Sequence, residues 1–498
     1  MNRFRHGAWL GGSRPRRSAH GRALLLVLPC LLMLSLTTCV GRRLPPAPGT
    51  TTARAPAPSE PLTRTAVAPR AGPPAATPKT EARPLPDVSQ RLDLGDAIAL
   101  AARRNPRLAA TRNRWHAATH RPAQASALPD PLLLYTENVI PIETRGGPIQ
   151  REFQLLQQIP FPGKLSASRA IETERARISR LDYEIALRDT VAEVKVTYAE
   201  LAYLHSALSV VEQNQAIAAQ LAQKAASSYG GAEPGRPDPT TLFDTLKAQS
   251  QLAQLSYDTV TLQEILTTEE ARLNELLHRP SGAVVGPPQP LAYRPLNATR
   301  EQLEFLARQR RQELEAALHE IKAAEHAQRL ANLSRVPDFT LGFKYWMIGE
   351  DGALGDRNGE DAFGVTFGMT LPVWAGKNRA RMAEAEYRKR AACLDRQSQL
   401  DALSTRIVKV FFRLQNAARL AVLYRDSLLP QAADAMRIAE AGRDAGRDTF
   451  GRLLEAQSVW LNFQLAYHRA VADHEQMVSR LEQLVGSSLA GYRRKEAP

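Results

Sequence analysis

The chain repeats itself at a spacing of a little over two hundred residues. The repeated anchors keep their order, and the length differences between the two copies fall in loops. Agreement at several anchors predicts that one supersecondary unit has been duplicated, so the fold must be built from two similar halves. The anchors are Gly-Lys at 163 and 376 (an offset of 213), Pro-Asp at 129 and 337, and Ala-Gln-Ser at 248 and 456 (both offsets 208).

Each half contains two short segments in which apolar and polar residues alternate. In FGVTFGMTL, residues 363–371, Phe, Val, Met and Leu alternate with Gly and Thr. Period-two alternation predicts β-strands with one apolar face. A soluble core would explain any one of them, whereas polar faces rich in Gly and Thr and lengths near ten residues are also typical of a membrane barrel. The other three segments are 132–139, which alternates least clearly, 153–161 and 339–347.

Long helical segments follow each pair of strands. Residues 166–229 contain no proline and carry apolar residues at every seventh position, and residues 378–429 repeat the pattern. A sustained heptad predicts side-by-side helix packing, and the first helix would run roughly 95 Å. The heptad positions are Leu187, Val194, Leu201 and Leu208 in the first segment and Leu400, Ile407, Leu414 and Ala421 in the second.

Shorter helical segments complete each half. Turns rich in Gly and Asp at 229–239 and 441–448 lead into return helices at 240–278 and 449–485. A further helical segment, from residue 92 to about 127, precedes the first strand. We expect breaks in it near Pro106 and Pro122, because proline cannot continue a helix without losing a hydrogen bond.

The first ninety residues hold most of the net charge. The formal charge of +14 would suit a nucleic-acid binder, but residues 1–90 contain 13 Lys/Arg and 3 Asp/Glu, which leaves only +4 for the other 408 residues. The folded part therefore lacks the basic excess of a nucleic-acid binder. Residues 41–90 are rich in Pro, Ala and Thr and predict an extended tether without a core.

An apolar run at residues 23–36 follows a cluster of arginines and predicts a secretory leader, since fourteen residues are too few to span a bilayer. The run ends in Leu36-Thr-Thr-Cys39, which resembles a bacterial lipobox. That resemblance implies cleavage before Cys39 and diacylation of its sulfur, although Thr38 differs from the usual Gly, Ala or Ser. The alternative is a leader with a chance cysteine. Val40, in place of Asp, favours export to the outer membrane.

The other cysteines, Cys30 in the leader and Cys393 on a predicted helix, leave no intrachain disulfide in the mature chain.

Three features together resemble the TolC-like outer-membrane efflux proteins over about residues 90–488. They are residues 92–110, the two Pro…Gly-Lys junctions and residues 445–470. The resemblance implies a mixed α/β membrane protein in which three protomers each give four strands to a twelve-stranded barrel that continues as an α-helical coiled-coil tunnel. Physics points the same way: four strands cannot close a barrel, and an open edge in lipid leaves backbone groups unsatisfied, so copies must share the sheet.

The expected organisation has five parts. They are a lipoprotein signal peptide (1–38), a lipidated tether (39–90), a first repeat (91–285), a second repeat (286–488) and a C-terminal tail (489–498).

The junctions from strand to helix form the first set of candidate site residues. A nucleotide-binding loop is excluded, because Gln158 stands where its first glycine is needed and neither lysine is followed by Ser or Thr. We expect proline to end the strand, glycine to allow a sharp bend, and lysine to lie at the inner membrane rim, either solvated or contacting phosphate. The residues are Pro160, Pro162, Gly163, Lys164, Pro372, Gly376 and Lys377.

The second set lies at the turn that the resemblance places at the periplasmic tip. Aligned with the founding member of the family, Glu455 takes the place of one pore-facing acid, whereas Arg452 stands at the other acidic position. Rings of like charge are one way to filter ions, but a charged helix end in water is the alternative. The candidates for tip closure and selectivity are Arg443, Asp444, Asp448, Arg452 and Glu455.

The sequence offers little support for other chemistry. His116 and His120 have a metal-ligand spacing but no evident third ligand, and the pairs His319/His326 and His468/His474 are spaced more widely. No catalytic motif is present, so we expect no enzyme activity, no cofactor and no bound metal.

The leading interpretation is a lipid-anchored homotrimeric outer-membrane channel extending into the periplasm. It would be the passive exit duct of a tripartite pump that exports small molecules or metal cations, with a slight preference for the heavy-metal branch. Its partners would be a periplasmic adaptor, an inner-membrane transporter of the RND type and outer-membrane lipids, with no nucleic acid. The alternative is a periplasmic coiled-coil adaptor or surface-tethering lipoprotein without a pore, whose strands would form small soluble domains instead.

Overall fold

The computed structural model describes residues 86–230, 239–350, 359–444 and 450–493. The chain divides into two units, Met1–Thr80 and Glu81–Pro498, and the first lies entirely outside the described residues. The predicted signal peptide, Cys39 and most of the tether therefore lie outside them as well. Everything below concerns the second unit.

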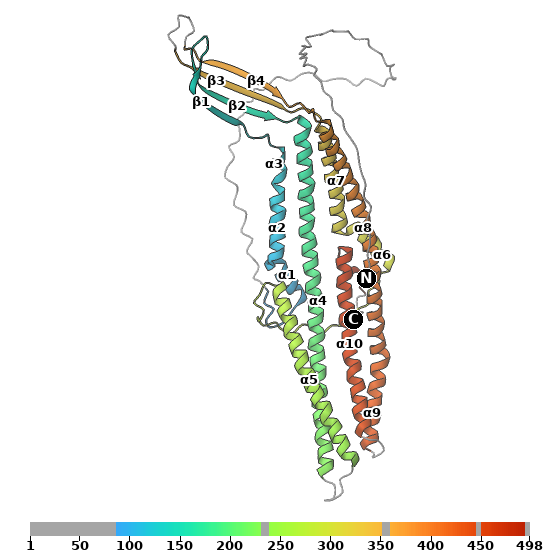
Figure 1. The fold of residues 1–498 in the computed structure, drawn as a ribbon. Helices are drawn as coiled ribbons and strands as arrows, with labels where there is room; N and C mark the ends of the chain where they lie inside the picture. The colour runs from blue at the N-terminus through green and yellow to red at the C-terminus, as the bar shows by residue number, and fades with distance from the viewer. Residues whose placement is uncertain (1–85, 231–238, 351–358, 445–449, 494–498) are drawn as a thin grey trace, which may run out of the picture. The chain divides into compact units, whose positions relative to one another are not determined.

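Each half of this unit contains helices, two strands, a long helix and a return helix (Figure 1). The first half comprises α1 (Leu94–Arg104), α2 (Pro106–Thr119), α3 (Arg121–Ser126), β1 (Leu132–Ile142), β2 (Ile149–Ile159), α4 (Pro162–Gly230) and α5 (Pro239–Leu276). The second comprises α6 (Arg300–Arg310), α7 (Gln312–Leu333), β3 (Phe339–Ile348), β4 (Ala362–Met369), α8 (Ala375–Leu423), a π-helix η1 (Tyr424–Leu428), α9 (Leu429–Asp444), α10 (Phe450–Val485) and a short 3₁₀ turn, η2 (Ala490–Tyr492).

The four strands form one antiparallel sheet in the order β1-β2-β3-β4. The two hairpins share one register: Leu133 lies opposite Leu155 in the first, and Leu341 lies opposite Phe367 in the second. Leu133 and Leu341 are 208 residues apart in the sequence, and Leu155 and Phe367 are 212 residues apart. The duplication seen in the sequence therefore extends to the hydrogen-bonding pattern of the sheet.

The first helices stop where the sequence predicts. Asp93 caps α1 by accepting hydrogen bonds from the backbone N–H groups of Gly95 and Asp96, and Asn105 caps α2 in the same way, with Pro106 at its first position. The second break falls at His120, two residues before Pro122. The predicted breaks near both prolines are confirmed.

The long helices extend beyond their predicted bounds. Both begin earlier than expected, at Pro162 and Ala375, and α4 with 69 residues is roughly 100 Å long. The segment predicted to end at residue 429 instead continues through Pro430 into α9. Pro430 lacks the N–H that the Asp426 carbonyl would accept, and η1 lies just before it, where one wider turn accommodates the missing bond.

No helix within the described residues has both the length and the apolar character needed to cross a bilayer.

The heptad positions form two equivalent cores. Val194 and Leu201 of α4 pack with residues of α1 and α5, while Ile407 and Leu414 of α8 pack with residues of α6, α7 and α10. The flanking heptad positions, Leu187, Leu208 and Leu400, are half-buried. Each long helix therefore organises the core of its own half, as the heptads predict.

Both ends of the packed unit extend past the predicted boundaries. Val88 is buried in the first core, and its carbonyl accepts a hydrogen bond from Gly286 N–H at 2.9 Å, so the tether ends before residue 88 rather than at 90. Leu489 is buried in the second core, and the Tyr492 carbonyl accepts a hydrogen bond from Asn297 N–H at 2.9 Å. The packed unit therefore includes Leu489 and Tyr492, past the predicted boundary at residue 489.

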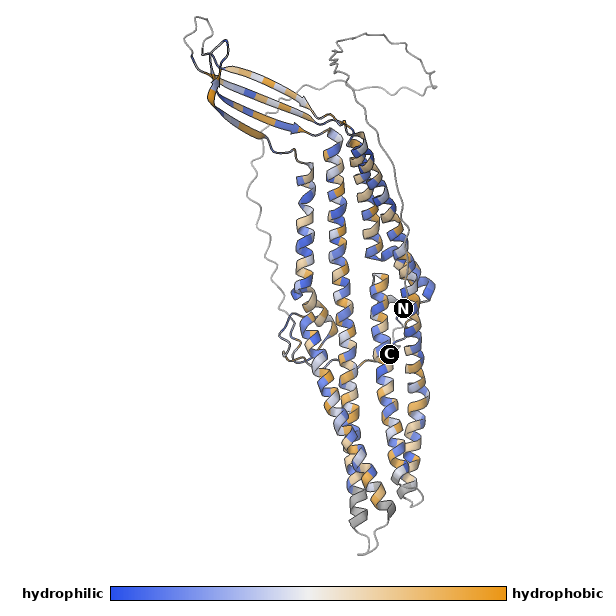
Figure 2. Cartoon of the chain, viewed as in Figure 1, coloured by the Kyte–Doolittle hydropathy of each residue, from blue (hydrophilic) through white to orange (hydrophobic). Residues whose placement is uncertain are grey.

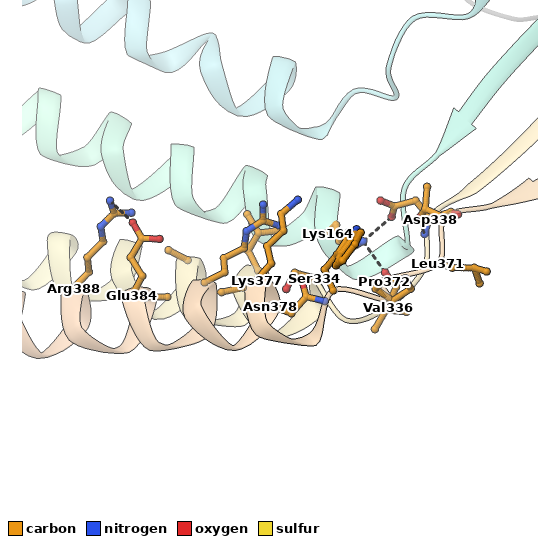
Figure 3. Close-up of a pocket in the computed structure, with 17 residues that line it drawn as sticks. Lys164, Ser334, Val336, Asp338, Leu371, Pro372, Lys377, Asn378, Glu384 and Arg388 are labelled. Carbon is orange, nitrogen blue, oxygen red and sulfur yellow. Dashed lines mark hydrogen bonds and ion pairs between the residues drawn. The ribbon is translucent and has the colours of Figure 1, made fainter. Parts of the chain in front are cut away.

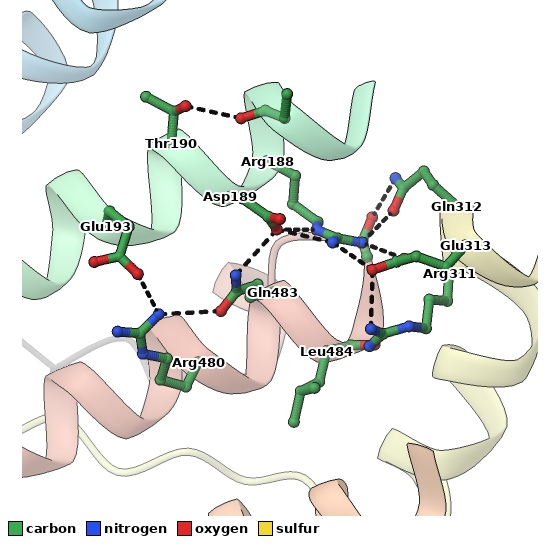
Figure 4. A network of polar contacts seen from close by, with 12 residues as sticks. Arg188, Asp189, Thr190, Glu193, Arg311, Gln312, Glu313, Arg480, Gln483 and Leu484 are labelled. Carbon is green, nitrogen blue, oxygen red and sulfur yellow. Dashed lines mark hydrogen bonds and ion pairs between the residues drawn. The ribbon is translucent and has the colours of Figure 1, made fainter. Parts of the chain in front are cut away.

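A polar network holds the two halves together where α4, α7 and α10 meet (Figure 4). Arg188 of α4 makes two parallel hydrogen bonds to Glu313 of α7, each 2.7 Å long. Arg311 donates to the same carboxylate at 2.9 Å and to the Leu484 carbonyl of α10 at 2.8 Å. Burial by itself would raise the pKa of Glu313, but the hydrogen bond from Arg188 and the charge of Arg311 outweigh it and lower that pKa below its ordinary value of 4.5.

We expect Glu313→Gln to destabilise the protein by about 2 kcal/mol at pH 7, between the values typical of exposed and buried ion pairs. Because the folded-state pKa of Glu313 is lowered, its contribution is fully present above pH 4.5 and is lost as the pH falls through the lowered value. Thermal unfolding of the detergent-purified wild type and variant between pH 7 and pH 3 measures this pH-dependent difference in stability.

The control is Glu386→Gln, which removes an exposed ion pair with Arg390 on α8 and should cost less than about 0.5 kcal/mol. If the stability difference between wild type and Glu313→Gln stays constant down to pH 3, the lowered pKa assigned to Glu313 is contradicted.

Candidate functional site

The sheet exposes a band of apolar side chains on one face. Odd-numbered residues on all four strands point to this face, and many of them are more than one-third exposed. In Figure 2 the strands alternate between hydrophobic and hydrophilic residues. A soluble sheet would cover such a face with helices or a second sheet. The exposed members are Leu133, Tyr135, Phe153, Leu155, Ile159, Leu341, Phe343, Tyr345, Phe363, Val365, Phe367 and Met369.

The opposite face is small and polar over much of β2, β3 and β4. Lys344 Nζ forms an ion pair with Glu152 at 2.6 Å, and Trp346 Nε1–H donates to the same carboxylate at 3.2 Å. A Cβ at Gly364 would lie 2.9 Å from the Trp346 ring, so glycine makes room for the ring there. Leu132, Leu134 and Leu156 make this face apolar near the helices, which is why the first predicted strand alternates least clearly.

Both edges of the sheet are open. Within the described residues, β1 pairs only with β2, and β4 pairs only with β3. The backbone groups along the outer edges therefore have no sheet partner in a single chain. Edges of this kind are sites where another strand can add.

At the first junction, Lys164 lies in the opening turn of α4 and reaches across to the second half of the chain. Its Nζ is 2.8 Å from Asp338 Oδ1 and 2.8 Å from the Val336 carbonyl oxygen. The same Asp338 oxygen accepts a hydrogen bond from Phe161 N–H at 2.8 Å. Lys164 therefore forms an ion pair that joins the β2–α4 junction to the α7–β3 junction. The sequence suggested either a solvated lysine or a contact with phosphate, and this ion pair is neither.

At the second junction the equivalent lysine, Lys377, has no ion-pair partner among the described residues. A pocket of about 560 Å³ opens beside it, and Lys377, Arg381, Arg388 and Trp374 are among the side chains that line it. Figure 3 shows Lys164 joined to Asp338 and Val336, whereas Lys377 on α8 makes no such contact. In the described part of the chain, Lys377 has no hydrogen-bond or ion-pair partner, and α8 begins without a side-chain cap.

The glycines of the junctions do not make the predicted bend. Both lie within the first turn of a helix, because β2 ends at Ile159 and β4 at Met369, earlier than expected. A Cβ at Gly163 would come within 2.9 Å of Leu333 Cδ1, so this glycine allows α4 and α7 to approach closely. Gly376 has no atom within 4 Å of the same position. β2 ends directly before Pro160, whereas β4 ends at Met369, three residues before Pro372.

The predicted tip residues are described only in part. Arg443 and Asp444 end α9, but their side chains, and all of Asp448, lie outside the described residues. Arg452 and Glu455 are exposed on α10, while the intervening Leu453 and Leu454 are buried with Leu221 of α4 and Ala248 of α5. Their helix face therefore points away from the packed core.

The histidine pairs do not gather further ligands. Among the described residues, no group of three His, Cys, Asp or Glu side chains is close enough to hold a metal ion. His319 Nδ1 instead lies 2.5 Å from Glu174 Oε2, where it joins α7 to α4. Burial lowers the pKa of the His468 imidazole.

The comparisons with known proteins agree with this geometry. Residues 305–487 match the family model described as "Outer membrane efflux protein". Among solved structures, the outer membrane protein VceC from Vibrio cholerae is 20% identical, with 80% of this chain and 96% of that chain covered and a TM-score of 0.65. The chain has the fold of the outer-membrane channels.

Two further structures share this outer-membrane channel fold. A membrane protein from Pseudomonas aeruginosa is 18% identical, with coverage of 80% and 92% and a TM-score of 0.67. The CmeC outer membrane channel from Campylobacter jejuni is 15% identical, with coverage of 81% and 87% and a TM-score of 0.62. The comparison with curated protein sequences found no match.

The sequence did not reveal the pairing partners within the site. Asp338 was recognised as part of a repeated Pro-Asp anchor, but its bond to Lys164 joins residues 174 positions apart. The signal that could have found it is the repeat: each half places one acid before its first strand and one lysine after its second.

Proposed function

We propose that this protein is an outer-membrane efflux channel, the passive exit duct of a transporter–adaptor–channel pump. The observation that carries the proposal is the four-stranded sheet with one exposed apolar face and two open edges. A lipid environment makes the apolar face favourable, but it makes open edges costly, by several kcal/mol for each unsatisfied backbone group. A barrel shared among copies satisfies both conditions.

Three copies form the assembly that we propose. Two copies would give eight strands and an interior filled by side chains, whereas three give twelve strands and leave a lumen. The polar face of β2–β4, with Lys344 and Glu152, would line that lumen, and the long helices would continue it into the periplasm. The match of residues 305–487 to the outer-membrane efflux family supports efflux as the function. The partners that we propose are a periplasmic adaptor and an RND-type inner-membrane transporter, and the proposed cargo is small molecules or metal cations.

We expect the purified full-length protein to form discrete, stepwise conductances in a planar lipid bilayer and to migrate on gels as a heat-dissociable oligomer. Both follow from a closed, water-filled barrel that is stable until its shared sheet is broken. Heat-denatured protein from the same preparation is the control and should give no steps. A soluble monomer that needs no detergent and forms no conductance would refute the channel and favour the tether or adaptor alternative.

We also propose that Cys39 anchors the mature chain to the outer membrane through acyl chains. The sequence supports this through the apolar leader and the lipobox-like residues 36–39. Metabolic labelling with palmitate should mark the wild-type protein and leave Cys39→Ala unlabelled. Cys30→Ala is the matched control and should remain labelled, because residue 30 is removed with the leader. Label retained in Cys39→Ala would contradict the anchor.

We further propose that the charged residues in and after the turn predicted at 441–448 narrow the tunnel and select among ions. As threefold rings, each would place three like charges around one opening. Cysteines introduced singly at Arg443, Asp444, Asp448, Arg452 and Glu455, in a Cys393→Ser background, should alter conductance when modified by a charged thiol reagent. The reagent should not affect the parent background. Unchanged currents at all five positions would discard the idea.

A further inference from the structure

The first junction makes a contact that the second junction, although duplicated, lacks. The bond from Lys164 to Asp338 joins the end of the first hairpin to the start of the second, beside the β2–β3 pairing. By the repeat, Lys377 corresponds to Lys164 and Asp130 corresponds to Asp338. Both Lys377 and Asp130 are exposed, and neither has an ion-pair partner among the described residues. They also lie beside opposite edges of the sheet, so they cannot meet within one chain.

The pairing of β2 with β3 provides a template for joining those edges. In it Leu155 lies opposite Phe343 and Gln157 lies opposite Leu341. By the repeat, each residue of β2 corresponds to the residue of β4 that lies 212 positions later, and each residue of β3 corresponds to the residue of β1 that lies 208 positions earlier. Applied to the pairing of β2 with β3, these offsets place Phe367 opposite Tyr135 and Met369 opposite Leu133. The side chains of Phe367 and Tyr135 are now 68% and 54% exposed. The template places them on the same apolar face, as an aromatic cross-strand pair of the kind that stabilises sheets.

The template also completes the second junction. In the first junction Asp338 accepts hydrogen bonds from both Lys164 Nζ and Phe161 N–H, and Lys164 donates to the Val336 carbonyl. The equivalent groups are Asp130, Lys377, the N–H of Trp374 and the carbonyl of Leu128. Asp130 from another copy would therefore supply the acceptor that the uncapped start of α8 lacks.

We propose that β4 of one copy pairs with β1 of a second copy in the register of β2 with β3, and that Lys377 of the first copy binds Asp130 of the second. The occupant of both open edges is thus another copy of this chain. The contact joins two different surfaces, head to tail, and such contacts generate closed rings when the rotation allows. This proposal rests on the proposed channel function and adds to it the residues that define the seam.

Charge exchange across the seam tests the ion pair. Lys377→Glu and Asp130→Lys should each reduce the fraction of protein that runs as an oligomer on unheated gels, by about tenfold at fixed concentration, which corresponds to about 1.4 kcal/mol for a partly buried pair. The double variant restores opposite charges between copies and should recover most of the oligomer. Arg379→Glu, on the exposed surface of the same helix, changes the charge equally and should have no effect. Single variants that behave like Arg379→Glu, or a double variant no better than either single one, would overturn the ion pair.

Disulfide trapping tests the register independently of stability. In the Cys393→Ser parent, Tyr135→Cys combined with Phe367→Cys should give disulfide-linked dimers and trimers on non-reducing gels, because directly opposite residues lie within disulfide range. Within one chain these residues are three strand spacings apart and cannot link. The matched control, Tyr135→Cys with Met369→Cys, is shifted by two residues and should link poorly. The parent without added cysteines should not link.

The outcomes separate this seam from the channel proposal. Conductance and particle mass are measured on the same preparations. Protein that is oligomeric and conducting, but in which only the shifted pair links or no pair links, would refute the seam and leave the channel standing. Protein that is monomeric and non-conducting would refute both. Efficient linking of Tyr135→Cys with Phe367→Cys alone, together with rescue by the charge exchange, supports the seam.

Discussion

The backbone hydrogen bonds along the edges of the sheet are the constraint on which the rest of the proposed architecture depends. A strand buried in lipid must have its N–H and C=O groups paired, because no water is available to replace a missing partner. The described part of one chain provides four strands and two edges without a sheet partner. In the proposed channel, lipid covers the apolar face and other copies pair with the two edges. Neither property alone would define an assembly, but together they favour the proposed ring of copies.

The helices have a different role: they hold the two duplicated halves together beside the sheet. Each half has its own apolar core around its long helix, so neither core by itself locks the halves together. Beside these cores, polar contacts cross between the halves: Arg188 binds Glu313, and Lys195 binds Glu482 at 2.6 Å. Nearer the turns, apolar clusters that include Leu255 with Leu461 and Leu221 with Leu454 also join the halves. Polar contacts are directional, so they define one register between helices whose apolar surfaces could slide by a turn.

Much of this architecture could be predicted from the sequence because it depends on local periodicity. Alternation located all four strands to within a few residues, and the heptads Val194/Leu201 and Ile407/Leu414 identified the buried stripes of the long helices. What escaped prediction depends on contacts between distant residues. Gly163 looked like a bend, and only the position of Leu333 shows that it allows close packing. The predicted heptad segment stopped at residue 429, yet η1 lets the helix continue through Pro430.

Lys164 and Lys377 occupy equivalent positions in the repeat, but among the described residues only Lys164 has an ion-pair partner. This difference shows how a duplication can encode an assembly. A repeat whose two halves met only each other would satisfy both junctions internally and leave no open edge. Here the halves are arranged in sequence along one sheet, and the contact made once inside the chain, between Lys164 and Asp338, is the one that we propose is made a second time between copies. In the proposed ring the internal and external seams alternate. They are similar but not identical, because the strand repeats at an offset of 212 residues and the lysine at an offset of 213, so the second junction is one residue longer.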